Sequence, residues 1–512
     1  MSEKRSTAGH RGVPSSQAFH DFISSGWSPR EERLPPLSAA ARFAAPRRER
    51  LSAAFPGDRL VVPAGGLKVR SNDTDYVFRP HTAFAYLTGL GSDREPDAVL
   101  VFEPLAGEGH EVTLFFRPLA PRDSAEFFAD SRFGEFWVGS RPTLEALSAE
   151  LGLLTRHIDD LEAALRGTDG DVVVRVVRDA DVDVTRLVDG LREAGSVVTP
   201  SAPEPEPEPD PEEEEEAPEH PGDQLLARTL STMRLVKDEW ESDQMREACL
   251  STARAFAAVV ADLPEAVKRG RGERWVEGVF GLHARHQGNG VGYDSICAAG
   301  DHANTLHWVK NTGDLDENDL ILIDAGVEVD SLYTADVTRT LPISGYFTDA
   351  QRKVYDAVYE AQCAGIEACR PGRTFKDVHA AAIRVIARHL FDWGLLPDGV
   401  TVEATLEKDG GQYHRRWMVH GTSHHLGLDV HDCQLALRGD YMEGTLRPGM
   451  LLTVEPGLYF KADDELVPPP LRGIGVRIED DVLITADGHE NLTAMLPRAS
   501  RDVEAWMAQI RR

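Results

Sequence analysis

The stretch LILIDAGVEVDSLYTADVTRTLPI, residues 320–343, decides the fold expected for this chain. Its two halves, 320–329 and 332–343, are rich in Leu, Ile, Val and Thr, which favour β-strands. Asp330 and Ser331 stand between them and are typical of turns. The stretch therefore predicts a β-hairpin whose turn is centred near Asp330.

Two carboxylates interrupt this apolar hairpin. A turn centred near Asp330 places Asp324 and Asp336 opposite each other on neighbouring strands. Facing Cβ atoms in an antiparallel pair are only about 4.5–5.5 Å apart, so two negative charges there repel each other. A bound metal ion is the simplest compensation, and a register that turns both side chains to solvent is the alternative.

Two further acidic residues lie in apolar, strand-like segments downstream. Glu455 belongs to TVEPGLY, residues 453–459, and Glu479 belongs to GVRIEDDVLIT, residues 475–485. Strand alternation puts Glu479 on the face that carries Arg477, away from the neighbouring Val and Ile side chains. Neither segment is a typical place for an unpaired charge, which raises the case for a cation.

Threonines accompany these acids at strand spacing. Thr453 shares a face with Glu455, and Thr338 shares a face with Asp336, because side chains two residues apart in a strand point the same way. Each threonine is therefore placed to orient a carboxylate by a hydrogen bond.

Histidines crowd into VHGTSHHLGLDVHD, residues 419–432. Each alone is more typical of an ordinary polar residue than of a ligand, but together with four acids they indicate a site for metal binding and proton transfer. Spacing does not say which histidine binds metal and which moves protons. The four are His420, His424, His425 and His431.

Four carboxylates and one imidazole form a donor set dominated by oxygen. Such a set suits Mn, Co or Zn better than metals that prefer thiolates. Five ligands exceed the needs of one small ion unless some acids bridge, and bridging implies two ions about 3.5–4 Å apart. Pairs of this kind activate water for attack on a carbonyl or phosphoryl centre, so the expected chemistry is hydrolysis.

The motifs resemble a known family. DAG, TADVTRT, HGTSHHLGLDVH, TVEPGLY and GVRIED occur in the order found in the pita-bread metallopeptidases, and within them are similar to the aminopeptidase P family. This match runs from about residue 233 to the end. The segments RSNDTDYVFRPHTAFAYLTGL and EPDAVLVFEP resemble the N-terminal domain of aminopeptidase P and prolidase.

The resemblance implies a dinuclear centre, usually of manganese. In it Asp336 and Glu479 bridge both ions, and Glu455 also acts as general base. The spacing between the two aspartates is one residue longer than is usual in the family, so the hairpin loop or a bulge must absorb the difference. The implied metal ligands are Asp324, Asp336, His424, Glu455 and Glu479.

The resemblance also implies roles around the ions. His431 and His307 match the histidines that contact substrate and shuttle protons, and His420 lines the substrate pocket. Arg477 and Tyr459 match positions that contact the substrate or support the ligands. The implied reaction removes an N-terminal residue linked to proline, through a hydroxide activated by the two ions.

Proline explains the need for a dedicated enzyme. Its amide has no N–H and a fixed φ, so peptidases that depend on that donor or on an extended strand are poorly suited to it. The expected partners are peptides with proline at the second position and further copies of the chain, as a dimer or a tetramer. Two alternatives are prolidase, which accepts only Xaa-Pro dipeptides, and a non-catalytic pita-bread binding module.

The expected fold class is a two-domain α/β (α+β) protein. A flexible arm, 1–44, precedes an N-terminal α/β domain of the creatinase type, 45–200. An acidic Pro/Glu linker, 201–223, leads to the pita-bread catalytic domain, 224–512. A tail that docks on a basic partner is the alternative reading of the linker. The catalytic domain opens with a long amphipathic helix, whose apolar face comprises Met245, Cys249, Phe256, Val259, Val260 and Leu263.

Composition excludes some classes of function. The net charge of −30 over 512 residues argues against nucleic acid as a partner, because phosphates would be repelled. The first 36 residues contain no apolar signal core, and no stretch of about 20 apolar residues occurs, so neither secretion nor a membrane is expected.

Five cysteines without a C-x-x-C pair suggest reduced thiols in the cytoplasm. Cys433 lies beside the histidines, but a small core residue is the preferred interpretation over a nucleophile.

Overall fold

The computed structural model divides into two compact units, Met1–Asp223 and Gln224–Arg512. Much of the predicted acidic linker lies outside the described residues, and its last three residues open helix α9 (Pro221–Arg234). The structure describes residues 16–30, 33–72, 74–166, 171–201 and 220–511.

Unit 1 is built on a mixed five-stranded sheet in the order β6–β5–β4–β1–β7. Strands β1, β4 and β5 pair antiparallel, whereas β6 and β7 join the two edges in parallel. A separate small hairpin is formed by β2 (Val69–Ser71) and β3 (Thr74–Asp75). The sheet strands are β1 (Arg59–Pro63), β4 (Val99–Pro104), β5 (His110–Phe116), β6 (Leu154–His157) and β7 (Val174–Val176).

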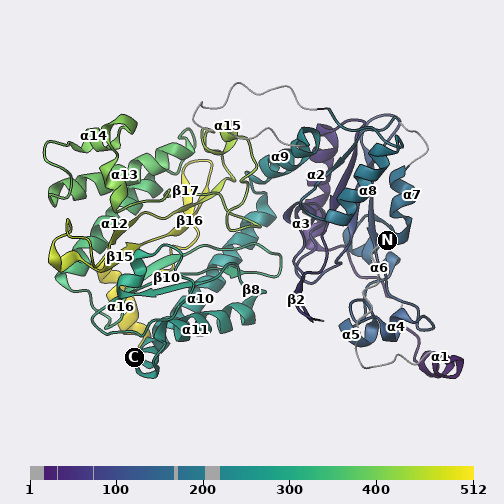
Figure 1. The fold of residues 1–512 in the computed structure, drawn as a ribbon, viewed down its shortest axis with the longest axis horizontal. Coiled ribbons are helices and arrows are strands. Elements are labelled where there is room, and N and C mark those ends of the chain that lie inside the picture. The colour runs from purple at the N-terminus through teal and green to yellow at the C-terminus, as the bar shows by residue number, and fades with distance from the viewer. Residues whose placement is uncertain (1–15, 31–32, 73, 167–170, 202–219, 512) are drawn as a thin grey trace. The chain divides into compact units, whose positions relative to one another are not determined.

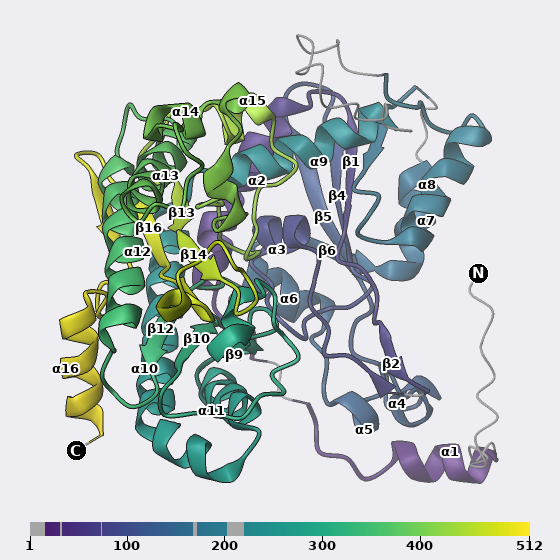
Figure 2. The same ribbon diagram turned by 60° about the vertical axis from the view of Figure 1, so that its left-hand side comes forward.

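Helices cover both faces of this sheet (Figure 2). On one face α7 and α8 bury Leu161, Leu165 and Val188 against strand residues such as Val61 and Val99. Helices α2 and α3 lie on the other face. The helices of unit 1 are α1 (Gln17–Ser24), α2 (Ala39–Ala54), α3 (Thr82–Thr88), α4 (Glu126–Ala129), α5 (Glu135–Val138), α6 (Leu144–Leu151), α7 (Leu161–Arg166) and α8 (Val182–Glu193).

The segment expected to be a flexible arm contains structure. Helix α1 sets the ring of Phe19 edge-on against Phe128, with centroids 5.3 Å apart, and Trp27 packs against Phe127 at 5.8 Å. Helix α2 begins at Ala39, so residues 39–44 are helical and pack on unit 1. Aromatic contacts of this kind explain why a segment rich in Ser and Arg is held against the sheet domain.

Unit 2 contains ten short strands in four sheets. The sheet orders are β12–β10–β9, β13–β16–β17, β14–β15 and β11–β8, all with antiparallel pairing. The strands are β8 (Gly290–Val291), β9 (Ile296–Ala299), β10 (Leu320–Asp324), β11 (Val327–Glu328), β12 (Thr338–Pro342), β13 (Leu451–Val454), β14 (Gly457–Phe460), β15 (Ile474–Arg477), β16 (Asp480–Ile484) and β17 (His489–Asn491).

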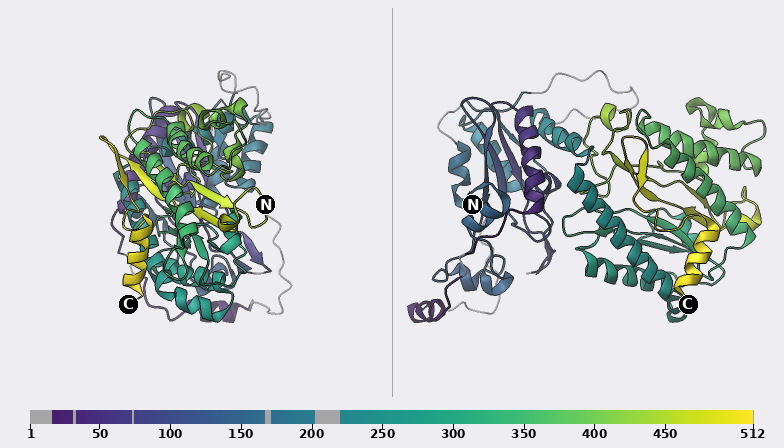
Figure 3. Two further views of the ribbon diagram at one scale, coloured as in Figure 1. Left: turned by 90° about the vertical axis from the view of Figure 1, so that its left-hand side faces the viewer. Right: turned by 180° about the vertical axis from the view of Figure 1, so that it is seen from behind.

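Two helix pairs enclose these strands (Figures 1 and 3). Helices α10 and α11 pack against β8, β9 and β11, whereas α12 and α13 pack together and α12 lies on β13, β14 and β15. The helices that follow α9 are α10 (Glu239–Arg269), α11 (Gly272–Gln287), α12 (Asp349–Ala368), α13 (Phe375–Asp392), α14 (Val402–Leu406), α15 (Arg438–Tyr441) and α16 (Ser500–Ile510).

Helix α10 confirms the amphipathic pattern expected at the start of the catalytic domain. All six apolar residues of the predicted face are buried. Its N-terminus is closed by a capping box, in which Asp238 accepts from the Glu241 amide and Glu241 accepts from the Asp238 amide. Since α10 spans 31 residues, it forms a rigid wall behind the central strands.

The core of unit 2 also settles the interpretation of Cys433. Its side chain is buried in an apolar cluster with Phe375, Met450 and Val482. Burial, reinforced by Asp432, raises the pKa of the Cys433 thiol to about 12, so it is no nucleophile near neutral pH. All five cysteines are free. Within the described ranges, none of the helices combines the length and apolar character that a membrane span requires.

Candidate metal centre

Strand ends bring the predicted ligands together in unit 2. Asp324 is the last residue of β10, and Asp336 lies two residues before β12. Glu455 directly follows β13, Glu479 lies between β15 and β16, and His424 lies in the loop before α15. Regular backbone pairing ends at each of these positions, which leaves the side chains free to turn toward one point.

The register of the first hairpin differs from the one predicted. Asp324 pairs with Thr338, not with Asp336, so the hairpin is centred one residue later than Asp330. Asp336 lies opposite Gly326, where a Cβ would stand only 1.6 Å from the Ala335 carbonyl oxygen. The predicted face-to-face pairing of the two aspartates was therefore wrong, although both side chains stay on one face of the hairpin because the shift is an even number of residues.

Tyr293 joins the two aspartates. Its hydroxyl lies 2.8 Å from Asp324 Oδ1 and 2.5 Å from Asp336 Oδ1. Burial, reinforced by the charges of Asp324 and Asp336, raises the pKa of Tyr293 well above its ordinary value. The hydroxyl therefore stays protonated and shares its single proton between one oxygen of each carboxylate, leaving the other oxygens for further partners.

His424 connects the first pair of acids to the third. Its Nε2 lies 3.3 Å from Asp336 Oδ2 and 3.8 Å from Glu455 Oε1. The backbone holds the histidine in place, because its amide donates to Thr453 Oγ1 at 3.1 Å and the Thr453 amide donates to the His424 carbonyl at 2.9 Å. Asp336, His424 and Glu479 each offer a ligand atom within 4.8 Å of the others.

Glu479 and Arg477 complete the constellation from the same strand segment. Thr338 Oγ1 donates to Glu479 Oε2 at 2.7 Å, so this threonine orients Glu479 and not Asp336 as its parity suggested. The Arg477 guanidinium donates to Thr338 Oγ1 at 3.1 Å and to Asp324 Oδ2 at 2.5 Å. Arg477 therefore lies at the site as predicted, and its carboxylate partner is Asp324.

The charges of the site are poorly balanced by protein groups. Burial, together with the charges of Asp336 and Glu455, raises the pKa of Glu479 well above its ordinary value. Burial likewise raises the pKa of Glu455 to about 7 and that of Asp324 above its usual range, despite the nearby His424 and Arg477. Four carboxylates, of which Asp336 and Glu479 are buried and Asp324 and Glu455 are partly buried, thus share one guanidinium and one imidazole.

Asp336 and His424 behave differently because they form a pair. Burial opposes ionisation of both, but their hydrogen bond and mutual attraction lower the pKa of Asp336 and raise that of His424 to about 9. An ordinary ion pair accounts for these two groups only. It leaves Glu455 and Glu479 without a cation, and a bound dication supplies what the site lacks.

The donor set fits divalent metal ions. Carboxylate oxygens and one imidazole nitrogen, buried and within a few ångströms of one another, match the ligands that Mn, Co and Zn accept. The four carboxylates repel one another, and bound positive charge would remove this repulsion and stabilise the cluster.

Four further predicted residues border the ligands. His420 Nε2 lies 2.7 Å from the Tyr459 hydroxyl, which accepts from Arg477 Nη1 at 3.1 Å. His420 Nδ1 is 3.8 Å from Glu455 Oε2. Burial, and then the charge of Arg477, lowers the pKa of His420 to about 3, so the ring is neutral at neutral pH. The structure therefore brings His420 and Tyr459 to the edge of the acid cluster.

His431 and His307 lie on the open side of the cluster. The ring centroids of His431 and His424 are 4.2 Å apart. Burial, and then the His424 charge, lowers the pKa of His431, and His307 is close enough to contribute to the same effect. Both side chains are exposed. They are thus the histidines of the site most accessible to a ligand from solvent.

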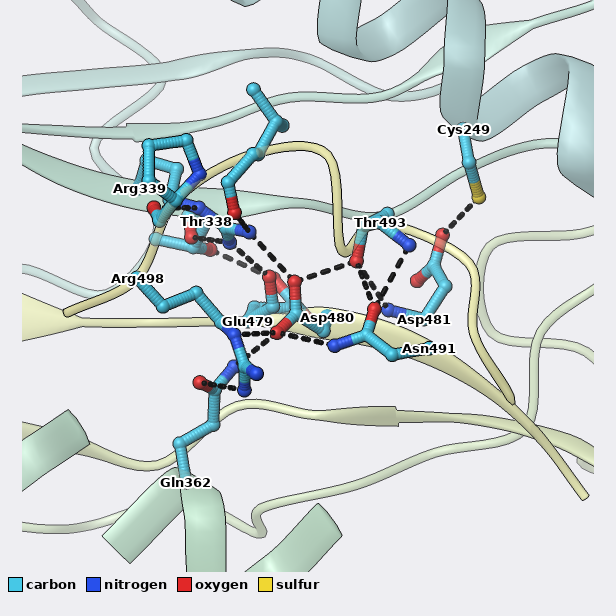
Figure 4. Close-up of polar contacts among 12 residues, drawn as sticks. Cys249, Thr338, Arg339, Gln362, Glu479, Asp480, Asp481, Asn491, Thr493 and Arg498 are labelled. Atoms are coloured by element: carbon cyan, nitrogen blue, oxygen red, sulfur yellow. Dashed lines mark hydrogen bonds and ion pairs between the residues drawn. The ribbon is translucent and has the colours of Figure 1, made fainter. Parts of the chain in front are cut away.

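Two residues that hold the site went unrecognised in the sequence. Tyr293 is a lone tyrosine in GNGVGYDS, a segment with no metal-binding pattern. Asp481 is buried, and its Oδ2 accepts from the Asp336 amide at 3.1 Å. The same oxygen accepts from the Cys249 thiol at 3.2 Å (Figure 4). In the sequence, Asp481 is marked only by the two consecutive aspartates of RIEDD. Two adjacent acids do not show which residue binds metal and which supports a ligand.

Comparison with known proteins defines the class. Residues 44–171 match the model of the aminopeptidase P N-terminal domain, and residues 243–486 match metallopeptidase family M24. The fold and the acid cluster thus belong to a two-domain metalloaminopeptidase that uses divalent metal ions.

The relatives narrow the class further. Xaa-Pro aminopeptidase 1 of Streptomyces coelicolor is 49% identical over 497 residues, which cover 97% of this chain and 93% of that protein. The Xaa-Pro aminopeptidase of Escherichia coli is 33% identical, over 89% of this chain and 95% of its own length. A structure of Zn-substituted E. coli aminopeptidase P in complex with product has a TM-score of 0.76 at 30% identity, covering 93% of this chain and 100% of that one. The chain belongs to the aminopeptidase P family, as its motifs indicated.

Proposed function

We propose that this chain is an Xaa-Pro aminopeptidase whose two metal ions are held by the five converging residues. Asp336 and Glu479 are the shared ligands, and manganese is the native metal. The observation that carries the proposal is the excess of buried carboxylate charge around Asp336 and Glu479, which the protein itself does not compensate. The ligands are Asp324, Asp336, His424, Glu455 and Glu479.

Bound divalent ions would supply a water that ionises near neutral pH and a Lewis acid for the scissile carbonyl. The protein's part is to hold and move protons around that chemistry. Glu455, whose pKa stands near 7 without metal, is the group that takes the proton from water. His420 Nδ1 donates to the Gly421 carbonyl at 2.5 Å and lies 3.8 Å from Glu455 Oε2, so the neutral ring borders that oxygen without competing for the proton.

The exposed histidines handle the substrate side. His431 and His307 face solvent next to the acid cluster, where they can donate to the developing oxyanion and to the prolyl nitrogen as it leaves. An amide nitrogen leaves as an amine only after it gains a proton, and this holds for the prolyl nitrogen as well. Tyr459 and Arg477 form a fixed hydrogen-bonded wall beside His420, against which the substrate can be positioned.

We further propose that peptides of three or more residues are the substrates, that the chain forms a dimer or tetramer, and that it works in the cytoplasm. The near full-length similarity to Xaa-Pro aminopeptidases supports the preference for longer peptides over the dipeptides of prolidase. The free state of all five cysteines supports a reducing compartment.

A peptide panel tests this function. The metal-loaded chain is expected to release the first residue from an Xaa-Pro-Xaa tripeptide, to act weakly on Gly-Pro, and to leave Xaa-Ala-Xaa intact. Liquid chromatography of the products measures each rate. Exclusive cleavage of Gly-Pro would instead identify a prolidase, and no cleavage of any peptide in the presence of Mn²⁺ would contradict an enzymatic role.

A further inference from the structure

A second feature of unit 2 adjoins the acid cluster. It is a cavity of about 430 Å³ between helix α13, the short helix Tyr413–Arg416 and the loop that carries His420. Its polar lining is entirely basic or neutral. The polar residues are His379, Arg384, Gln412, His414, Arg415 and His420.

The cavity adjoins the proposed general base through the side chain of His420. His420 lines it and also faces Glu455 Oε2 at 3.8 Å. His379 lines it too, and its Nδ1 lies 3.2 Å from Thr422 Oγ1. The Thr422 carbonyl in turn accepts from the Glu455 amide at 2.8 Å. A substrate held at Glu455 can therefore extend into this cavity.

Two guanidinium groups in the lining have no carboxylate partner among the described residues. Arg384 and Arg415 are both exposed, and Arg415 Nη1 donates only to the neutral Gln412 side chain, at 3.2 Å. Arg415 also acts on a neighbour, because burial, and then the charges of His414 and Arg415, lowers the pKa of His379 to about 4. In a chain with a net charge of −30, this local excess of positive charge stands out.

A second cavity nearby shows the contrast. It has a volume of about 300 Å³ and is bordered by Tyr459, but its cations are accompanied by acids. There Arg416 pairs with Asp464 at 2.9 Å. The two cavities flank the His420–Tyr459 pair, and only the one with Arg384 and Arg415 leaves its guanidinium groups unmatched.

We propose that the cavity lined by Arg384 and Arg415 is a subsite for a carboxylate on the part of the peptide that follows proline. This inference rests on the proposed function. An aminopeptidase substrate carries a cationic amine before the scissile bond, whereas its terminal carboxylate and any acidic side chains of later residues lie beyond it. Guanidinium groups bind carboxylates through charge-assisted hydrogen bonds, so the basic cavity takes the leaving segment.

The test compares matched peptides on the metal-loaded, full-length chain. Ala-Pro-Ala against its C-terminal amide probes the terminal carboxylate, and Ala-Pro-Glu-amide against Ala-Pro-Gln-amide probes an acidic side chain. The wild-type chain is expected to show kcat/KM about fivefold to tenfold higher for the charged member of at least one pair. The pair that shows the preference identifies the source of the carboxylate.

Paired variants assign the effect to the cavity. Arg384→Gln combined with Arg415→Gln is expected to abolish the preference while keeping kcat/KM on the uncharged peptides within about twofold of wild type. Arg388→Gln is the matched control, because Arg388 lies one turn further along α13 and already pairs with Glu360. This control is expected to keep the full preference.

The outcomes separate the two proposals. Equal cleavage of charged and uncharged peptides by the wild type, or an unchanged preference in the double variant, would overturn the subsite alone. No cleavage of any of the four peptides would overturn the proposed function and the subsite with it.

Discussion

Two neighbouring acidic regions of unit 2, around Asp480 and around Glu479, differ in how far the protein compensates their negative charge. Asp480 is fully buried, yet every oxygen is matched by donors from the protein (Figure 4). Among the described residues, the carboxylate of its neighbour Glu479 accepts one hydrogen bond, from Thr338. The donors to Asp480 are Arg339 at 2.7 Å, Gln362 at 3.0 Å, Asn491 at 3.1 Å, Thr493 at 2.6 Å and Arg498 at 3.1 Å.

The contrast shows how a single strand segment separates a structural charge from a functional one. Two guanidinium groups face the single carboxylate of Asp480, so that region is complete without any further ion. At Glu479 four carboxylates share one guanidinium and one imidazole. A buried acid that the protein leaves unmatched is the sign of a site for an external cation.

Removing one shared ligand is expected to have the largest effect. Asp336→Asn should lower kcat/KM by at least about 10³-fold and reduce bound metal, because a neutral amide cannot hold two cations. Metal analysis and a peptide assay on the same preparation measure both quantities. Activity equal to wild type would be incompatible with a shared carboxylate.

A substitution at Asp480 should instead reduce stability and leave metal binding unchanged. Asp480→Asn leaves the buried Arg339 guanidinium without its carboxylate and should lower the free energy of unfolding by about 3 kcal/mol, with metal content retained. Urea unfolding and metal analysis report these separately. Arg498→Gln is a milder control, since Arg498 is partly exposed. Loss of metal without loss of stability in Asp480→Asn would erase the distinction between the two regions.

The pH dependence of the metal-free chain sharpens the comparison. Burial raises the pKa of Glu455 from 4.5 to about 7, so the folded state holds this proton more tightly than the unfolded state. The contribution of Glu455 is therefore present below pH 4.5 and is lost as pH rises through 7, by up to about 3 kcal/mol.

Several histidines have lowered pKa values and change the stability with pH in the opposite direction. Comparison with a Glu455 variant separates the contribution of Glu455 from theirs. The unfolding free energy of the wild type minus that of Glu455→Gln, both in chelator, should fall between pH 4.5 and 7. Urea unfolding at half-unit steps of pH measures it. A difference that stays flat, or rises, would show that Glu455 is not strained by burial among like charges.

A supporting hydrogen bond should have the smallest effect. Thr338→Val removes the donor to Glu479 Oε2 and should weaken metal affinity by about 10–100-fold while the fold is kept. Titration with Mn²⁺ measures the affinity. Thr340→Val is a suitable comparison, because Thr340 lies on the same strand but donates to the Arg477 carbonyl. Equal losses in both variants would point to general damage to β12.

Much of this could be predicted from the sequence, because each acid stands in an apolar strand segment, where an unpaired charge is unusual and a cluster of four favours a bound cation. The long helix α10 followed from the spacing of its apolar residues. The register of the first hairpin did not follow, since alternation fixes the face of a side chain but not the centre of the turn. The roles of Tyr293 and Asp481 depend on contacts between distant segments, so no local pattern marks them.

Counting the ions tests the central claim most directly. The full-length chain, stripped with chelator and dialysed against Mn²⁺, should hold about two ions per chain by elemental analysis, and peptidase activity should return in proportion to them. Activity on an Xaa-Pro-Xaa peptide from protein that holds almost no divalent metal would contradict the account, because the unmatched carboxylates would then need another explanation.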